Sequence, residues 1–240
     1  MADIILSLSE VSKSFPLGWK RRIPVVKAAS FSLRRGDVYT LVGPNGSGKT
    51  TITKMIVGLY RRTGGVIRIF NRPYQDQSVR RRIGYLPEIC FFPPFLTAAQ
   101  FLRTVCALYN MSREAARECS AVLLKRVGLD GVSTRIGVYS KGMSKRLGLA
   151  QALVGNPELV IMDEPLDGLD PVGVALFRSL MDELKEKKVT VLLTSHLLHE
   201  VEQFSDRVGF IKEGTIIKEV TIHDSRRTTT LTDLYLSLMS

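Results

Sequence analysis

One short segment constrains this chain more than any other feature: Gly43-Pro44-Asn45-Gly46-Ser47-Gly48-Lys49-Thr50. It follows the pattern G-x-x-x-x-G-K-[ST] of a phosphate loop. The apolar run 38–42 before it predicts a strand, and the stretch 49–59 after it predicts a helix. In such a turn, backbone N–H groups and a helix N-terminus converge on a phosphate. The segment therefore predicts an α/β fold with a nucleotide-phosphate site at this turn.

Two side chains of the loop carry specific chemistry. Lys49 supplies a positive charge for β- and γ-phosphates, and the hydroxyl of Thr50 is a ligand for Mg²⁺. The remaining candidates for nucleotide contact at this turn are Gly43, Pro44, Asn45, Gly46, Ser47, Gly48 and Thr51.

The net charge favours an anionic partner without identifying it. The chain has 34 Lys and Arg residues against 23 Asp and Glu residues, which gives a formal charge of +11. Nucleotide phosphates, nucleic acid or an acidic membrane surface would each suit such a chain. Its 45% hydrophobic content excludes wholesale disorder, and no apolar run is long enough to predict a transmembrane helix. The three cysteines, Cys90, Cys106 and Cys119, lack a zinc-site spacing and are interpreted as reduced thiols.

The order of predicted elements divides the chain. Strands and helices alternate over residues 1–90 and 157–222, which predicts an α/β core. Residues 91–156 contain helical stretches without strands, so we expect a helical subdomain inserted in the core. Over 223–240, apolar residues at helical spacing predict one amphipathic helix.

Two carboxylates follow a buried strand. The run Leu159-Val160-Ile161-Met162 is apolar on both faces, as parallel strands are, and Asp163 and Glu164 come directly after it. Ligands bind at the carboxyl ends of such strands. Asp163 can hold Mg²⁺ directly or through water, and Glu164 can orient the attacking water in phosphoryl transfer. His196 follows the apolar run 189–194 and occupies the corresponding position of another strand, where it can contact the γ-phosphate.

The segment Tyr139-Ser140-Lys141-Gly142-Met143-Ser144 resembles the signature motif of ABC-type ATPases. With the phosphate loop, Asp163-Glu164 and Ser195-His196, it stands in that family's order and spacing. The resemblance implies a P-loop NTPase (ABC ATPase) core with an antiparallel β subdomain and an inserted α-helical subdomain. It also implies ATP and Mg²⁺ as cofactors, with hydrolysis at a head-to-tail interface between two ATPase chains.

The same resemblance assigns further roles. Phe15 is similar to the aromatic residue that stacks on adenine, although a core aromatic at a strand end is the alternative. Ser140 and Gly142 correspond to the signature residues that contact the γ-phosphate of nucleotide across the dimer. Asp170 corresponds to the D-loop residue at the dimer seam, and His196 to the switch histidine.

Three segments depart from the family's pattern. Lys141 and Met143 stand where the best-known signature has Gly and Gln. Glu88 stands where the Q-loop glutamine is usual. A carboxylate there can accept from metal-bound water, but it adds negative charge near Mg²⁺ and could weaken nucleotide binding. The segment Trp19–Arg22 resembles a hairpin tip that is longer and more basic than usual.

The segments around Glu88 and Ser140, and the ending around Tyr235, resemble the ABC-2-type exporter branch. That resemblance implies a separate transmembrane subunit, an ATPase pair that we expect to be a homodimer, and a peripheral position at the cytoplasmic face of the membrane. The aromatic-rich region Glu88–Phe101 is the expected contact with the transmembrane subunit. The alternative is that these rings pack the helical insertion.

Other functions remain open on the sequence. A soluble ABC-type ATPase could drive cofactor assembly or act on a macromolecule, and a nucleotide-gated module could work without turnover. Nucleic acid is not expected as a partner because no recognition module is visible. The basic runs 20–22, 61–62 and 80–82 are interpreted as surfaces for anionic lipid, for acidic partner loops or for solvent.

Overall fold

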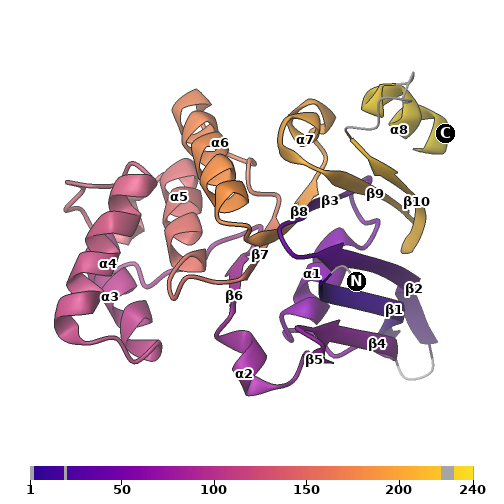
Figure 1. Ribbon diagram of the computed structural model, residues 1–240, viewed down its shortest axis with the longest axis horizontal. Coiled ribbons are helices and arrows are strands. Elements are labelled where there is room, and N and C mark those ends of the chain that lie inside the picture. The colour runs from indigo at the N-terminus through magenta and orange to yellow at the C-terminus, as the bar shows by residue number, and fades with distance from the viewer. Residues whose placement is uncertain (1–2, 19–20, 223–229, 240) are drawn as a thin grey trace.

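The computed structural model describes residues 3–18, 21–222 and 230–239, and their elements form two sheets (Figure 1). The six-stranded sheet has the order β10-β9-β3-β8-β7-β6. Its strands are β3 (Val38–Val42), β6 (Ile83–Leu86), β7 (Leu159–Asp163), β8 (Thr190–Ser195), β9 (Arg207–Lys212) and β10 (Thr215–Thr221). All neighbours pair in parallel except β10, which pairs antiparallel with β9. The parallel core that the sequence predicts is therefore present.

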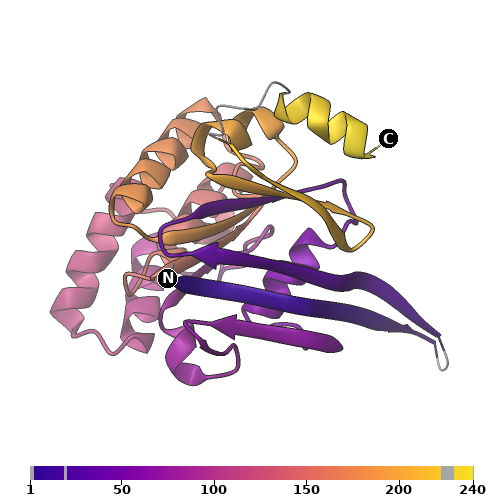
Figure 2. The same ribbon diagram turned by 45° about the vertical axis from the view of Figure 1, so that its right-hand side comes forward.

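The second sheet is antiparallel and has the order β2-β1-β4-β5. Its strands are β1 (Ile4–Leu17), β2 (Arg21–Arg34), β4 (Gly64–Ile69) and β5 (Arg72–Pro73). The ribbon of β1 and β2 extends well beyond the rest of the sheet (Figure 2). Helix α1 (Lys49–Ile56) lies between the two sheets, since its buried side chains share one core with both.

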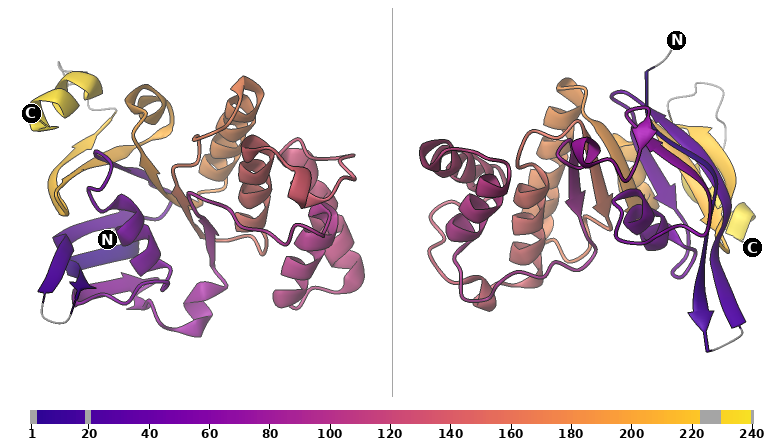
Figure 3. Two further views of the ribbon diagram at one scale, coloured as in Figure 1. Left: turned by 180° about the vertical axis from the view of Figure 1, so that it is seen from behind. Right: turned by 90° about the horizontal axis from the view of Figure 1, so that it is seen from below.

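The remaining helices cover the other face of the parallel sheet and one end of the molecule. Helices α3 (Ala98–Leu108), α4 (Arg113–Arg126) and α5 (Lys141–Ala152) gather at the end opposite the antiparallel sheet (Figures 1 and 3). Beside them are α6 (Pro171–Glu186) and α7 (Leu198–Phe204), and α8 (Leu231–Met239) packs near α7. The short elements α2 (Gln77–Arg80) and the 3₁₀ turn Ile136–Val138 complete the fold.

Side chains of the central strands alternate between two cores. Val160 and Met162 of β7 belong to the core under the helical end, whereas Leu159 and Ile161 belong to the core that contains α1. All four are fully buried. A strand buried on both faces must be apolar throughout, which is why this run reads as a continuous hydrophobic segment.

Helix starts follow capping chemistry. Helix α5 begins at Lys141, where the Ser140 hydroxyl caps its first turn by accepting the N–H of Met143 at 3.1 Å. Asp170 caps α6 in the same way through Gly173 N–H, and Pro171 occupies its first position. Both caps fix residues that the sequence singled out.

Some expectations fall outside the described residues or change with the structure. Residues 1–2, 19–20, 223–229 and 240 are not described, so the hairpin tip at Trp19-Lys20 and the start of the expected tail stay predictions. Arg82 of the basic run 80–82 is not a free surface cation, because it donates to Glu158 at 2.6 and 2.9 Å. Among the described residues, no helix has the length and apolar character needed to cross a bilayer.

Candidate functional site

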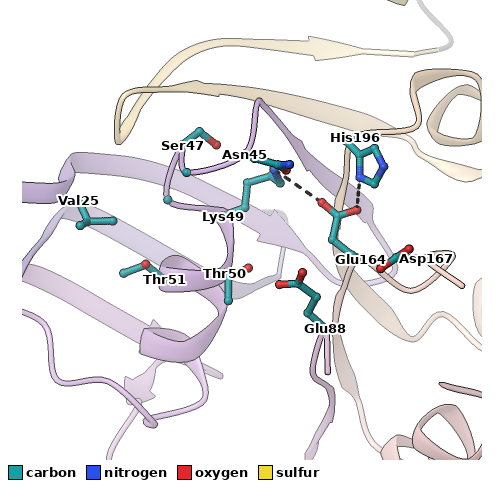
Figure 4. A pocket seen from close by; sticks show the side chains of 12 residues that line it. Val25, Asn45, Ser47, Lys49, Thr50, Thr51, Glu88, Glu164, Asp167 and His196 are labelled. Carbon is teal, nitrogen blue, oxygen red and sulfur yellow. Dashed lines mark hydrogen bonds and ion pairs between the residues drawn. The ribbon is translucent and has the colours of Figure 1, made fainter. Parts of the chain in front are cut away.

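A pocket of about 380 Å³ lies over the carboxyl ends of three strands (Figure 4). Because β3, β8 and β7 are neighbours, the loops that leave them converge at one edge of the sheet. The loop after β3 and the first turn of α1 together contribute most of the lining, and the segments after β7 and β8 add Glu164, Asp167 and His196. The complete lining is Val25, Asn45, Gly46, Ser47, Gly48, Lys49, Thr50, Thr51, Glu88, Glu164, Asp167 and His196.

The phosphate loop has the conformation that its glycines permit. Gly46 and Gly48 adopt φ of 79° and 106°, the left-handed region that favours glycine. Lys49 is buried and donates to the Gly43 carbonyl at 2.7 Å and the Pro44 carbonyl at 3.3 Å. The Ser47 hydroxyl is buried in the described part of the chain without a hydrogen-bond partner there. An unpaired buried donor beside these amides is suited to an incoming phosphate oxygen.

Glu164 connects the phosphate loop to His196. Its Oε1 lies 3.7 Å from Lys49 Nζ, and its Oε2 lies 2.8 Å from His196 Nδ1 (Figure 4). Glu164 is 9% exposed and has φ of 47°, an uncommon conformation for a non-glycine residue. The backbone turns at this residue directly after β7 and aims the carboxylate into the pocket.

Asp163 is held beneath the pocket by two threonines. Thr194 Oγ1 donates to Asp163 Oδ1 at 2.6 Å and accepts the Glu164 N–H at 3.0 Å. Thr53 Oγ1 lies 3.4 Å from the other carboxylate oxygen. Asp163 is fully buried and does not itself belong to the pocket lining. Sequence reasoning missed Thr53 and Thr194. The only signals were a hydroxyl one turn after Thr50 and another at the end of an apolar strand.

Asp167 is a pocket residue that sequence reasoning also missed. Lys141 Nζ pairs with its carboxylate at 2.9 Å, and this hydrogen bond is the largest effect that lowers the pKa of Asp167. The stem of Lys141 packs over Gly168, whose added Cβ would lie 2.6 Å from Lys141 Cδ. Lys141, which the sequence marked as a departure, therefore joins the start of α5 to the edge of the pocket.

The signature residues lie outside the pocket of their own chain. Among the described residues, the pocket lining does not include Ser140, Gly142 or Asp170. Gly142 lies close to the loop before α6, since an added Cβ would be 2.9 Å from the Gly168 carbonyl. Ser140 and Asp170 cap the N-termini of α5 and α6.

Phe15 has contacts of its own on β1. Its ring meets Tyr60 edge-on with centroids 5.3 Å apart, and Lys13 Nζ lies 4.7 Å from its centroid. Phe15 is half-buried and packs against these two side chains instead of entering a hydrophobic core, and adenine stacking stays a prediction.

Oxygen donors suited to Mg²⁺ are present without a preformed cage. Glu88 and Thr50 line the pocket, and Asp163 lies behind it. In the described part of the chain, no group of three or more His, Cys, Asp or Glu residues forms a metal site. Mg²⁺ commonly retains waters and is held by one or two protein groups together with phosphates, so this donor set fits a nucleotide-bound ion.

The chain was compared with known proteins. Residues 26–167 match the ABC transporter family. Among relatives, an uncharacterized ABC transporter ATP-binding protein of Synechocystis is 36% identical over 87% of this chain and 60% of its own length. The bacitracin transport ATP-binding protein BcrA of Bacillus licheniformis is 38% identical over 80% of this chain and 63% of its own length. The lantibiotic transport ATP-binding protein SrtF of Streptococcus pyogenes is 36% identical over 90% of both chains. The chain thus spans less than two thirds of the Synechocystis and B. licheniformis relatives.

Solved structures agree with this match. An ATP-binding subunit of an ABC transporter superposes with a TM-score of 0.87, at 29% identity and over 98% of this chain and 100% of that one. A dimeric ATP-binding cassette in a post-hydrolysis state, bound to ADP and Pi, gives a TM-score of 0.85 at 25% identity over 92% of this chain and 100% of that one.

Proposed function

Because this chain belongs to the ABC transporter family, we propose that it is an ATP-binding subunit that hydrolyses MgATP to drive transport through a separate transmembrane subunit. The observation that carries this proposal is the bridge from Lys49 through Glu164 to His196 in the phosphate-loop pocket.

The residues of the pocket divide the work of hydrolysis. Lys49 and the loop amides bind the β- and γ-phosphates, while Glu164 accepts a hydrogen bond from the attacking water and orients it. His196 holds the Glu164 carboxylate from the other side and contacts the γ-phosphate. Bound Mg²⁺ would neutralise phosphate charge, with Thr50, Glu88 and Asp163 as its protein ligands, directly or through water.

A second ATPase chain completes the site. Since Ser140 and Gly142 lie outside their own pocket, we expect them to serve the nucleotide of a partner chain, with Asp170 at the seam. The dimeric cassette bound to ADP and Pi supports this arrangement. We propose a homodimer in which residues 91–156 form a helical subdomain that carries the signature, inserted in a core of residues 1–90 and 157–222.

The transmembrane subunit is expected at the aromatic region. Ile89, Phe91 and Phe95 are 63%, 87% and 67% exposed, and large apolar side chains gathered on one loop mark an interaction site. Phe92 instead packs against Phe101, with centroids 4.9 Å apart, so the packing alternative holds for part of the segment. A peripheral position at the cytoplasmic membrane face and a role in export follow from the same assignment.

Two measurements test the proposal. Phosphate release by the purified chain with MgATP should depend on Lys49, so Lys49→Ala should abolish it. Affinity purification from detergent-solubilised membranes, with mass spectrometry, should recover a polytopic membrane protein in stoichiometric amount. Recovery with soluble partners alone would replace the transporter function with a soluble assembly ATPase.

A further inference from the structure

Lys145 is a buried lysine in the second turn of α5, and the reaction described above gives it no role. It is 2% exposed and donates to the carbonyls of Glu88 at 2.7 Å and Pro87 at 3.4 Å. Lysine is almost never fully buried unless its ammonium group is paired. Here the hydrogen-bond partners are backbone atoms of the one loop that carries Glu88 into the phosphate pocket.

The same helix packs against both flanks of this loop. An added Cβ at Gly148, about one turn after Lys145, would lie 2.6 Å from Leu86 Cδ1 and 2.7 Å from Cys90 Sγ. A larger residue at this position would have to displace the Leu86 and Cys90 side chains. Leu86 and Cys90 bracket Glu88, so α5 supports the loop before and after the pocket residue.

The charge of Lys145 also suits this place. Burial lowers the pKa of Lys145, while Cys90, Asp167, Asp163 and Glu88 act on it electrostatically in the opposite direction. Three of these groups are carboxylates at or behind the phosphate pocket. A buried cation at this point offsets their mutual repulsion.

We propose that Lys145 is a positioning residue that fixes the Glu88 carboxylate at the pocket and ties its loop to α5, the helix that Ser140 caps. The Glu88 loop belongs to one nucleotide site, and the signature segment at Ser140 serves the other site. Lys145 then makes these two segments move together. This inference rests on the proposed ATPase function, and its first test does not depend on turnover.

The first test is amide hydrogen exchange without nucleotide. In Lys145→Met, peptides covering 86–92 should exchange about tenfold faster than in the wild type, because the loop loses its anchor at the Pro87 and Glu88 carbonyls and the segment opens more often. Lys145→Gln keeps a donor and should show a smaller increase. Arg146→Gln is the matched control, since Arg146 is the next residue on α5 and donates instead to the carbonyls of Val127 and Gly128. Unchanged exchange in Lys145→Met would overturn the inference.

The second test is a double-mutant cycle on kcat. Lys145→Met should lower kcat about tenfold in the wild-type background and less than about twofold beside Glu88→Ala, because no carboxylate is then left to position. Arg146→Gln should have the same effect in both backgrounds. If Lys145→Met lowers kcat by the same factor in both backgrounds, Lys145 does not act through Glu88 and has only a packing role. A wild type without turnover, with the exchange result intact, would contradict the ATPase function and leave the anchoring role standing.

Discussion

Glu164 Oε2 lies 2.8 Å from His196 Nδ1, and these two residues follow neighbouring parallel strands at the edge where the phosphate loop begins. The other oxygen of Glu164 faces Lys49 Nζ at 3.7 Å. The carboxylate is therefore shared between a cation that binds phosphate and an imidazole. In the proposed reaction a bound phosphate would compete with Glu164 for Lys49, so nucleotide binding would change the contacts of the proposed base.

Glu164→Gln should lower kcat by about 10²- to 10⁴-fold, because an amide cannot accept the proton of the attacking water. Phosphate contacts are retained, so an ATP-bound dimer should accumulate and elute earlier than the wild type in size-exclusion chromatography with MgATP. Lys49→Ala should not hydrolyse ATP, and MgATP should not change its elution volume. Near-wild-type phosphate release by Glu164→Gln would remove this residue from catalysis.

Thr194→Val should destabilise the fold by about 1–3 kcal/mol, because the buried Asp163 carboxylate loses its 2.6 Å donor and the Glu164 N–H loses its acceptor. Valine has nearly the same shape, so packing is preserved. Urea unfolding measures the change, and Thr194→Ser, which keeps the hydroxyl, should be closer to the wild type. If Thr194→Val unfolds with the same free energy as the wild type, the hydrogen bonds of Thr194 to Asp163 and Glu164 contribute little to stability.

Lys141→Met should raise KM for MgATP about threefold at low salt, because Asp167 at the pocket edge loses the cation that balances it. Methionine retains the stem that packs over Gly168. The effect should shrink at high ionic strength, where exposed charges are screened. The double variant Lys141→Met/Asp167→Asn should have a KM for MgATP close to that of the wild type. An increase in KM of Lys141→Met that does not depend on salt would indicate a loss of packing instead of a loss of charge.

The free energy of unfolding should depend on pH in the acid range because of Glu158. Hydrogen bonds from Arg82 and then Arg35 lower the pKa of Glu158 from about 4.5 to about 2. A depressed folded-state pKa gives stabilisation that is full above about 4.5 and is lost as pH falls toward about 2. The carboxylate is 39% exposed, so the contribution is screened and small. The stability difference between wild type and Glu158→Gln, measured in urea from pH 7 to pH 3, should narrow below pH 4.5. A constant difference would contradict this role.

Phe91→Asp or Phe95→Asp should reduce about tenfold the amount of membrane subunit recovered in the affinity purification, because each variant would bury a charge in an apolar contact. Both rings are exposed, so neither change opens the core. Leu108→Asp, at an equally exposed position on α3, is the matched control and should not alter recovery. Full recovery with both phenylalanine variants would exclude this loop as the docking surface.

The candidate residues of the pocket could be identified from the sequence because their signals are local. The phosphate loop 43–50 is fixed by glycines at set spacing beside one lysine, and Asp163-Glu164 stand out as acids directly after an apolar strand. Ser140 and Asp170 were found by resemblance, and the structure adds that each is a helix cap.

Only the tertiary structure decided what supports those residues. Thr194 meets Asp163 from 31 positions away, and Lys145 reaches Glu88 across 57. Such contacts depend on which strands are neighbours, in which register, and on how closely α5 approaches β6. The sequence determines local conformation through backbone preference and hydrophobic period, which act over a few residues. Hydrogen bonds between distant segments exist only after the sheet order β3-β8-β7-β6 has brought those segments together.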